Sequence, residues 1–190
     1  MIKIAILGDI GAGKSFVASK FNLPVFNADK EVQKIYKYNK SVYVSLKKLF
    51  PKNISKFPIN KKELINIIIN NKANINLIGK IIHPIVSSKL KLFIKKRSKK
   101  RGVILDIPLL VENKLTDKKT VMIYVDSKKR DIVKKLHKRK NFNKKIYKIM
   151  KNKQKSLNYK KKISRFIIYN NFNKTHVMNQ IKKIKKELKI

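Results

Sequence analysis

The sequence lacks cysteine and tryptophan altogether. A chain without cysteine has no disulfide bonds, no zinc site built on thiolates and no cysteine nucleophile. It also lacks an apolar run close to the roughly 20 residues that a membrane-spanning helix needs, and its first apolar run has the length of a strand, not of a signal peptide. The length of 190 residues favours one compact domain. We therefore expect a single cytoplasmic domain without a membrane partner.

Acidic residues are scarce: ten stand against 50 lysines and arginines, so the formal net charge is +40. Such a charge points to a possible nucleic-acid partner. The excess is almost all lysine, however, and lysine rises together with asparagine and isoleucine along the whole chain, as in coding sequence rich in A and T. A nucleic-acid-binding protein more often gathers arginine and aromatic residues on one face. We expect solvated basic faces that attract anionic substrates and bind no specific nucleic acid; a salt-sensitive affinity for polyanions is the alternative.

Glycine is scarce as well, yet three of the five glycines fall within GDIGAGKSF, residues 8 to 16. Gly8, Gly13, Lys14 and Ser15 match the P-loop spacing G-x-x-x-x-G-K-S/T. The apolar run at 2–7 predicts a buried strand before the loop, and the apolar spacing after it predicts a helix. Strand, loop and helix come in the order that the motif requires, so the sequence predicts a nucleoside triphosphate site.

The residue types of this loop suit phosphate. Glycines let successive backbone N–H groups turn inward around phosphate oxygens, and the following helix adds the positive end of its dipole. Lys14 is expected to reach the β- and γ-phosphates, and the Ser15 hydroxyl to bind Mg²⁺.

Apolar runs of strand length alternate with helical segments along the rest of the chain. Strands are predicted at 2–7, 24–29, 102–106, 120–126 and 165–171, and helices at 127–138 and 174–189 among others. This alternation predicts an α/β fold with a parallel sheet. A mostly helical insertion at about 35–97 is too long for a simple crossover and is interpreted as a subdomain that covers the substrate.

Two carboxylates are candidates for phosphoryl-transfer chemistry, which needs a group to accept the hydroxyl proton and usually another near the metal. Asp29 and Asp106 each end a predicted strand, where ligands bind in open α/β sheets. Asp29 is expected to be catalytic, with helix capping as its alternative. Asp106 either holds Mg²⁺ through water or anchors the turn before Pro108. Asp9 occupies a variable position of the loop, and Glu112 is a candidate for holding a loop.

Seven segments of the sequence, taken in order along the chain, resemble the bacterial dephospho-CoA kinases. They are GDIGAGKS, LPVFNAD, IIHP, VILDIPLLVE, VMIYVD, KQKSLNYK and FIIYNN. The resemblance implies ATP-dependent phosphorylation of the ribose 3′-hydroxyl of dephospho-CoA, the last step of coenzyme A synthesis. It also implies a P-loop kinase core at about 1–34, 98–134 and 160–190, with a helical CoA-binding insertion at about 35–97. A lid is implied at about 135–159.

The resemblance implies residue roles too. Asp29 matches the second aspartate of the family's DAD stretch, which makes it the general base, and Arg139 matches a lid arginine that closes on the transferring phosphate. His83, Gln154 and Lys160 match substrate-binding segments; without the family, His83 is more often a structural residue at a helix start and Lys160 one lysine among many. The ATP phosphates are held by the side chain of Lys14 and by the backbone amides of Gly11, Ala12, Gly13, Lys14, Ser15 and Phe16.

Three positions depart from the family pattern. Asn27 stands at the first aspartate of DAD, Phe16 at the usual threonine, and Ser87 where arginine is frequent, so a paired-carboxylate site and one phosphate contact are in question. Nearby lysines offer point charges in place of that arginine. The alternatives are another small-molecule P-loop kinase, a basic nucleic-acid-binding P-loop protein, and a kinase fold that binds without turnover.

Overall fold

The fold is organised around one five-stranded parallel sheet, seen in a computed structural model that describes residues 1–112, 117, 119–139 and 142–190. The strand order is β2-β3-β1-β4-β5, with β1 at the centre. The strands are β1 (Ile2–Gly8), β2 (Val25–Asn27), β3 (Gly102–Asp106), β4 (Thr120–Asp126) and β5 (Phe166–Tyr169). The expected α/β class with a parallel sheet is confirmed.

Alternation along the central strand supplies both hydrophobic cores. Ala5 and Leu7 belong to one buried cluster, whereas Ile4 and Ile6 belong to the other. Successive side chains of a strand point to opposite faces, so a run that is apolar throughout needs helices on both sides. One face is covered by α1 (Lys14–Lys20), α6 (Lys129–His137) and α9 (Lys174–Glu187). The other is covered by helices between β2 and β3 and by α8 (Leu157–Lys162).

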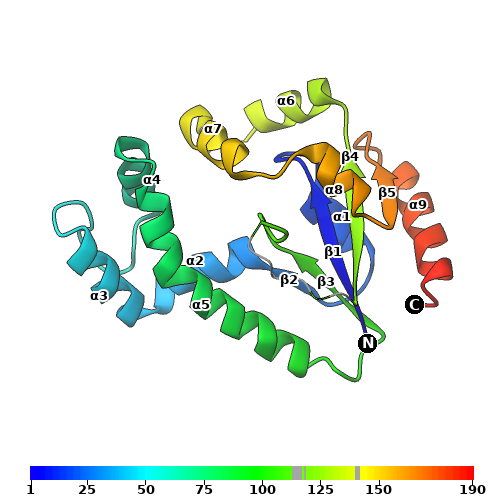
Figure 1. Ribbon diagram of the computed structural model, residues 1–190, viewed down its shortest axis with the longest axis horizontal. Coiled ribbons are helices and arrows are strands. Elements are labelled where there is room, and N and C mark those ends of the chain that lie inside the picture. Colours follow the sequence, from blue (N-terminus) through cyan, green and yellow to red (C-terminus); the bar gives the residue numbers. More distant parts are fainter. Residues whose placement is uncertain (113–116, 118, 140–141) are drawn as a thin grey trace.

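Four helices separate β2 from β3 in the sequence, and they extend away from the sheet on the left of Figure 1. They are α2 (Ala28–Tyr38), α3 (Lys40–Leu49), α4 (Lys61–Asn70) and α5 (Asn74–Lys95). Asparagine side chains begin three of these helices: Asn27, Asn39 and Asn60 each accept a hydrogen bond from a backbone amide of the first turn. Such caps satisfy amides that otherwise have no helical partner.

Helix α7 (Lys144–Lys153) contacts α4 and lies above the sheet in Figure 1. Together with α6 it overhangs the carboxyl end of β1. No helix in the described part of the chain combines the length and apolarity that crossing a membrane requires.

Two expectations at β2 and α5 were wrong in detail. The predicted strand at 24–29 ends at Asn27, because Asn27 caps α2 and Asp29 therefore lies in the first turn of that helix. His83 lies in the middle of α5 and not at a helix start, since the helix continues through Pro84. Proline removes one backbone hydrogen bond there without ending the helix.

Candidate active site

The phosphate loop runs from the end of β1 into α1, and its shape depends on glycine. Gly13 caps α1 with φ of 86°, in the left-handed region, and a β-carbon there would collide with the Asn170 carboxamide. That carboxamide donates to the Ala12 carbonyl at 2.8 Å, and the Ser127 hydroxyl donates to the same carbonyl at 3.0 Å. These two hydrogen bonds fix the position of the Ala12 carbonyl. Successive backbone N–H groups of a loop with this sequence are suited to binding phosphate.

Lys14 lies within this loop. Its Nζ donates to the carbonyls of Asp9 at 2.7 Å and Gly8 at 3.3 Å. Burial lowers the pKa of Lys14 to about 8, and the charge of Asp106 acts in the opposite direction. A phosphate at the loop would supply the negative charge that favours the ammonium form.

Two carboxylates face this loop from neighbouring elements. Asp106 ends β3, is 4% exposed, and accepts a 2.6 Å hydrogen bond from the Asn27 amide group. Asn27 is the strand partner of Asp106 and also caps α2, so it fixes both the carboxylate and the helix that carries Asp29. Removal from water and then the Asp106 charge raise the pKa of Asp29, while Lys61, Lys14 and Arg139 act against that increase.

These groups line one cavity of about 480 Å³. Its first wall is formed by strand ends and by the phosphate loop, including Gly11, Gly13, Lys14, Ser15, Phe16, Asp29 and Asp106. Its second wall is formed by helices and their connections, including Lys61, Arg139, Tyr147, Met150, Gln154 and Lys160. We call these the strand-end wall and the helical wall. Residues far apart in the sequence, from Ile6 to Lys160, therefore meet around one cavity.

A buried ion pair supports the helical wall. Lys160 is 3% exposed, and its Nζ donates to the Glu112 carboxylate at 2.8 Å. Burial alone would raise the pKa of Glu112, but hydrogen bonds from Lys160 and from the Lys155 amide outweigh it and hold that pKa below its usual range. Glu112 thus holds a loop, as predicted. The neighbouring Gln154 Oε1 is buried and has no donor among the described residues.

The structure brings most of the predicted site residues together, with two exceptions. Ala12 is buried and serves through its backbone. His83 lies on the exposed face of α5, outside the cavity lining, where partial burial and the charge of Lys153 lower its pKa. Sequence reasoning missed Lys61, Ser127 and Asn170. Only Ser127 and Asn170 carried a local signal, since Ser127 directly follows the predicted strand at 120–126 and Asn170 lies near the end of the one at 165–171.

Sequence comparison places this cavity in a known context. The family model for dephospho-CoA kinase matches residues 2–176. The chain belongs to the dephospho-CoA kinase family. A dephospho-CoA kinase of Wolbachia pipientis wMel is 31% identical over 186 residues, which cover 95% of this chain and 95% of that protein. Membership identifies the chain as a kinase, and a kinase of this family uses ATP.

Solved structures agree at the level of the fold. A Thermus thermophilus protein superimposes with a TM-score of 0.77 at 22% identity, covering 98% of this chain and 97% of the other. A dephospho-CoA kinase from Campylobacter jejuni superimposes with a TM-score of 0.65 at 22% identity, covering 98% and 96%. The sheet, the phosphate loop and the flanking helices therefore form a P-loop kinase fold.

Proposed function

We propose that this protein transfers the γ-phosphoryl group of ATP to the ribose 3′-hydroxyl of dephospho-CoA. One observation carries the proposal beyond family membership: the phosphate loop, Asp29 and two cationic side chains, Lys61 and Arg139, line the same cavity. A triphosphate donor, an acceptor hydroxyl and a base have to meet at one place for this reaction.

The strand-end wall would hold the donor. The amides of the phosphate loop and Lys14 bind the β- and γ-phosphates, and Lys14 neutralises charge on the oxygens between which the phosphoryl group moves. Asp29 accepts the proton of the 3′-hydroxyl and orients that hydroxyl toward the γ-phosphorus. Its raised pKa, caused by removal from water and by Asp106, makes it a better proton acceptor than an ordinary aspartate.

A magnesium ion fits the donor side. Mg²⁺ keeps several waters and needs only one or two protein ligands beside the substrate phosphates. The Ser15 hydroxyl and the Asp106 carboxylate line the cavity, and no cluster of three or more histidine or acidic residues competes for the ion among the residues described. Ser15 would bind it directly and Asp106 through water, and the ion would neutralise phosphate charge.

The helical wall would receive dephospho-CoA. We assign residues 35–97 to a substrate-binding insertion and 135–159 to a lid, with the core at 1–34, 98–134 and 160–190. Lys61 belongs to the insertion and Arg139 and Gln154 to the lid, and all three line the cavity. Arg139 would close on the transferring phosphate, while Gln154 would accept a hydrogen bond from the acceptor. Lys160 supports the helical wall through its ion pair with Glu112. His83 would contact dephospho-CoA only if α5 and the lid move toward each other.

ADP release with a panel of hydroxyl acceptors tests this function. We expect turnover with dephospho-CoA and none with nucleosides, sugars or shikimate, with Lys14→Ala as the inactive control. Turnover of a nucleoside in preference to dephospho-CoA would overturn the acceptor assignment. ATP binding without turnover of any acceptor would instead indicate a kinase fold that has lost its reaction.

A further inference from the structure

We infer that Lys151 of α7 is a positioning residue for the nucleotide, because it neutralises Asp9 inside the phosphate loop. This inference rests on the ATP binding proposed above. The carboxylate of Asp9 lies where a negative charge would weaken ATP binding.

Asp9 carries its charge at the edge of the predicted phosphate site. It lies between Gly8 and Ile10, both of which line the cavity, and its side chain is 14% exposed. Its Oδ1 accepts a 2.6 Å hydrogen bond from the Ile10 amide, and its backbone carbonyl accepts one from Lys14. The carboxylate is therefore held beside the loop and is largely shielded from solvent.

An unpaired carboxylate in this position would repel the triphosphate. Like charges repel strongly in a partly buried site, because little water screens them. The loop also directs its amides and the positive end of the α1 dipole at the phosphates, and a fixed negative charge opposes both. A chain with aspartate at position 9 thus needs a cation nearby.

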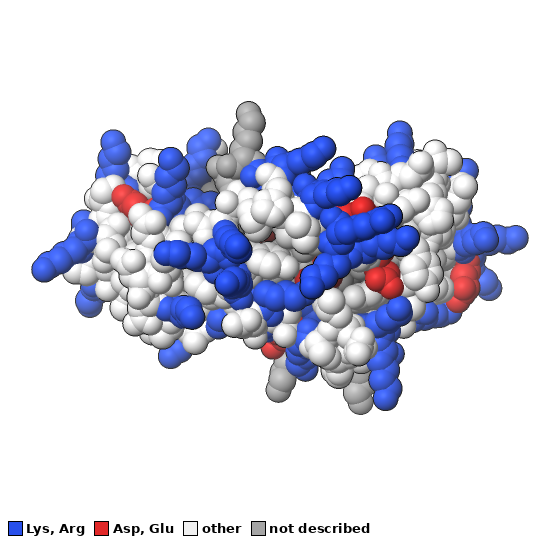
Figure 2. Space-filling view, turned by 90° about the horizontal axis from the view of Figure 1, so that it is seen from above, with Lys and Arg blue, Asp and Glu red and all other residues white. Residues whose placement is uncertain are grey.

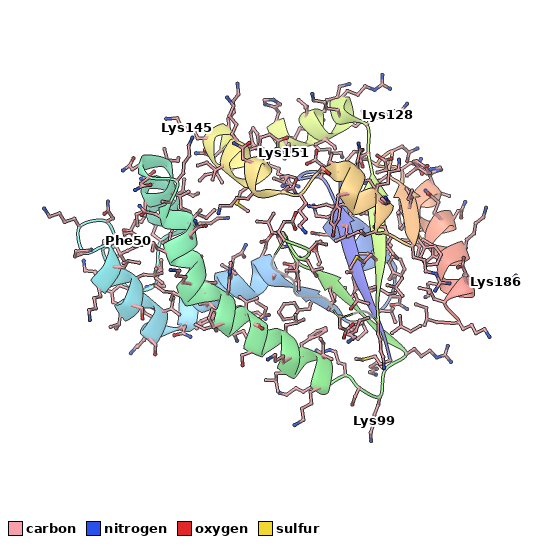
Figure 3. All side chains as sticks on the ribbon, viewed as in Figure 1. Phe50, Lys99, Lys128, Lys145, Lys151 and Lys186 are labelled. Atoms are coloured by element: carbon pink, nitrogen blue, oxygen red, sulfur yellow. The ribbon has the colours of Figure 1, made fainter. Side chains whose placement is uncertain are left out.

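Lys151 supplies that cation from a distant part of the chain. Its Nζ lies 2.6 Å from both Asp9 carboxylate oxygens, although the two residues are 142 positions apart. Figure 3 shows Lys151 on α7 near the carboxyl end of β1, where the loop begins. It is the one ion pair, among the residues that the structure describes, that joins α7 to the phosphate loop.

The pairing differs in kind from a direct phosphate contact. Lys151 uses both carboxylate oxygens of Asp9, and it does not line the cavity itself. Its effect on the nucleotide must therefore pass through Asp9. Removing Asp9 should then remove the need for Lys151, whereas a lysine that binds phosphate directly would still be needed.

A double-mutant cycle measured by ATP titration calorimetry separates these two roles. We expect Lys151→Met to weaken ATP binding about tenfold or more, because it leaves the Asp9 charge unpaired beside the triphosphate. Asp9→Asn should bind ATP more tightly than wild type, and Asp9→Asn combined with Lys151→Met should recover an affinity within about threefold of Asp9→Asn alone. Lys151→Arg should keep most of the wild-type affinity.

Lys145→Met is the matched control. Lys145 lies in the first turn of the same helix, is exposed, makes no ion pair with a described residue, and is labelled in Figure 3. Its removal lowers the net charge equally and should leave the ATP affinity unchanged. Thermal unfolding of each variant confirms that the folded protein is being titrated.

Two results would overturn the inference. One is wild-type affinity in Lys151→Met, and the other is a double variant as weak as Lys151→Met alone, which would assign Lys151 to the phosphates directly. If the wild-type protein does not bind ATP, the proposed nucleotide site is wrong. That outcome differs from the two results above, which concern only the variants.

Discussion

The two walls of the cavity are built in different ways. In the strand-end wall the positions of the groups follow from the backbone: the loop carbonyl of Ala12 is fixed by Ser127 and Asn170, and Asp106 by Asn27. In the helical wall, Lys61 is the exposed first residue of α4, and Arg139 is an exposed residue in the segment that follows α6. Long exposed side chains lose rotamer freedom when they bind a ligand. We therefore expect the strand-end wall to be preorganised for its ligand, and the exposed cations of the helical wall to become ordered only on binding.

Charges from both walls act on Asp29, which itself belongs to the strand-end wall. Removal from water and then the Asp106 charge raise the pKa of Asp29. Lys61 and Arg139 on the helical side and Lys14 on the strand-end side act to lower it. Cations that approach with a closing lid would therefore favour the ionised base as the acceptor is seated. On the face seen in Figure 2, lysine and arginine side chains extend from one end to the other.

The largest effect should come from changing Asp29. Asp29→Asn keeps the shape of the side chain but cannot accept a proton, so kcat should fall by about 10²- to 10⁴-fold. Part of the loss would come from misplacing the hydroxyl, because phosphoryl transition states are loose. ATP affinity, measured by calorimetry, should stay within about threefold of wild type, since Asp29 is not a phosphate-binding group. Turnover within a few-fold of wild type would place the base elsewhere, with Asp106 next.

Lys14→Ala tests the strand-end wall and should impair both ATP binding and phosphoryl transfer. Losing a fixed cation at the developing charge should lower kcat/KM by about 10²- to 10³-fold. ATP binding should weaken as well, in contrast to Asp29→Asn. Near-normal kcat/KM would contradict the assignment of the loop, because the other lysines cannot occupy the same position.

The difference between the walls also explains what could be predicted from the sequence. The P-loop was predictable because its residues are contiguous and their spacing is set by local backbone geometry. The five strands were predictable because parallel strands buried on both faces are continuous apolar runs. Boundaries were less accurate at Asn27, where one side chain ends a strand, caps a helix and binds a carboxylate across the sheet.

The helical wall could not be predicted at the same level. Lys61 and Lys151 are two of 50 basic residues, and nothing in their immediate sequence separates them from the rest. Their roles depend on how α4 and α7 are placed relative to the sheet, which is a matter of tertiary packing. His83 shows the opposite situation: the histidine-proline pair is easily recognised in the sequence, but its side chain on α5 lies outside the cavity lining, so its expected contact with substrate stays a prediction.

Adjacent lysines offer a test of the helical wall. Lys61 lines the cavity and faces Asp29, whereas Lys62 is exposed and does not line it. Lys61→Met should raise KM for dephospho-CoA about tenfold, the cost of losing one charge-assisted contact, and leave ATP affinity unchanged. Lys62→Met carries the same change of charge and should leave KM unaltered. Equal effects in both variants would reduce Lys61 to a contributor to the general positive field.

An effect no larger than that of Lys61→Met concerns the pH dependence of ATP binding at the strand-end wall. Burial lowers the pKa of Lys14 to about 8 from its usual 10.5, whereas a bound triphosphate favours the ammonium form. Below pH 8 the free enzyme already carries the proton, and above it ATP binding must take one up. The dissociation constant should therefore rise by about tenfold between pH 7 and pH 9, with proton uptake appearing over the same range. Calorimetry in buffers of different ionisation enthalpy measures that uptake, and Lys14→Ala should abolish it. A proton uptake that persists in Lys14→Ala would assign the titration to another group and leave Lys14 charged throughout.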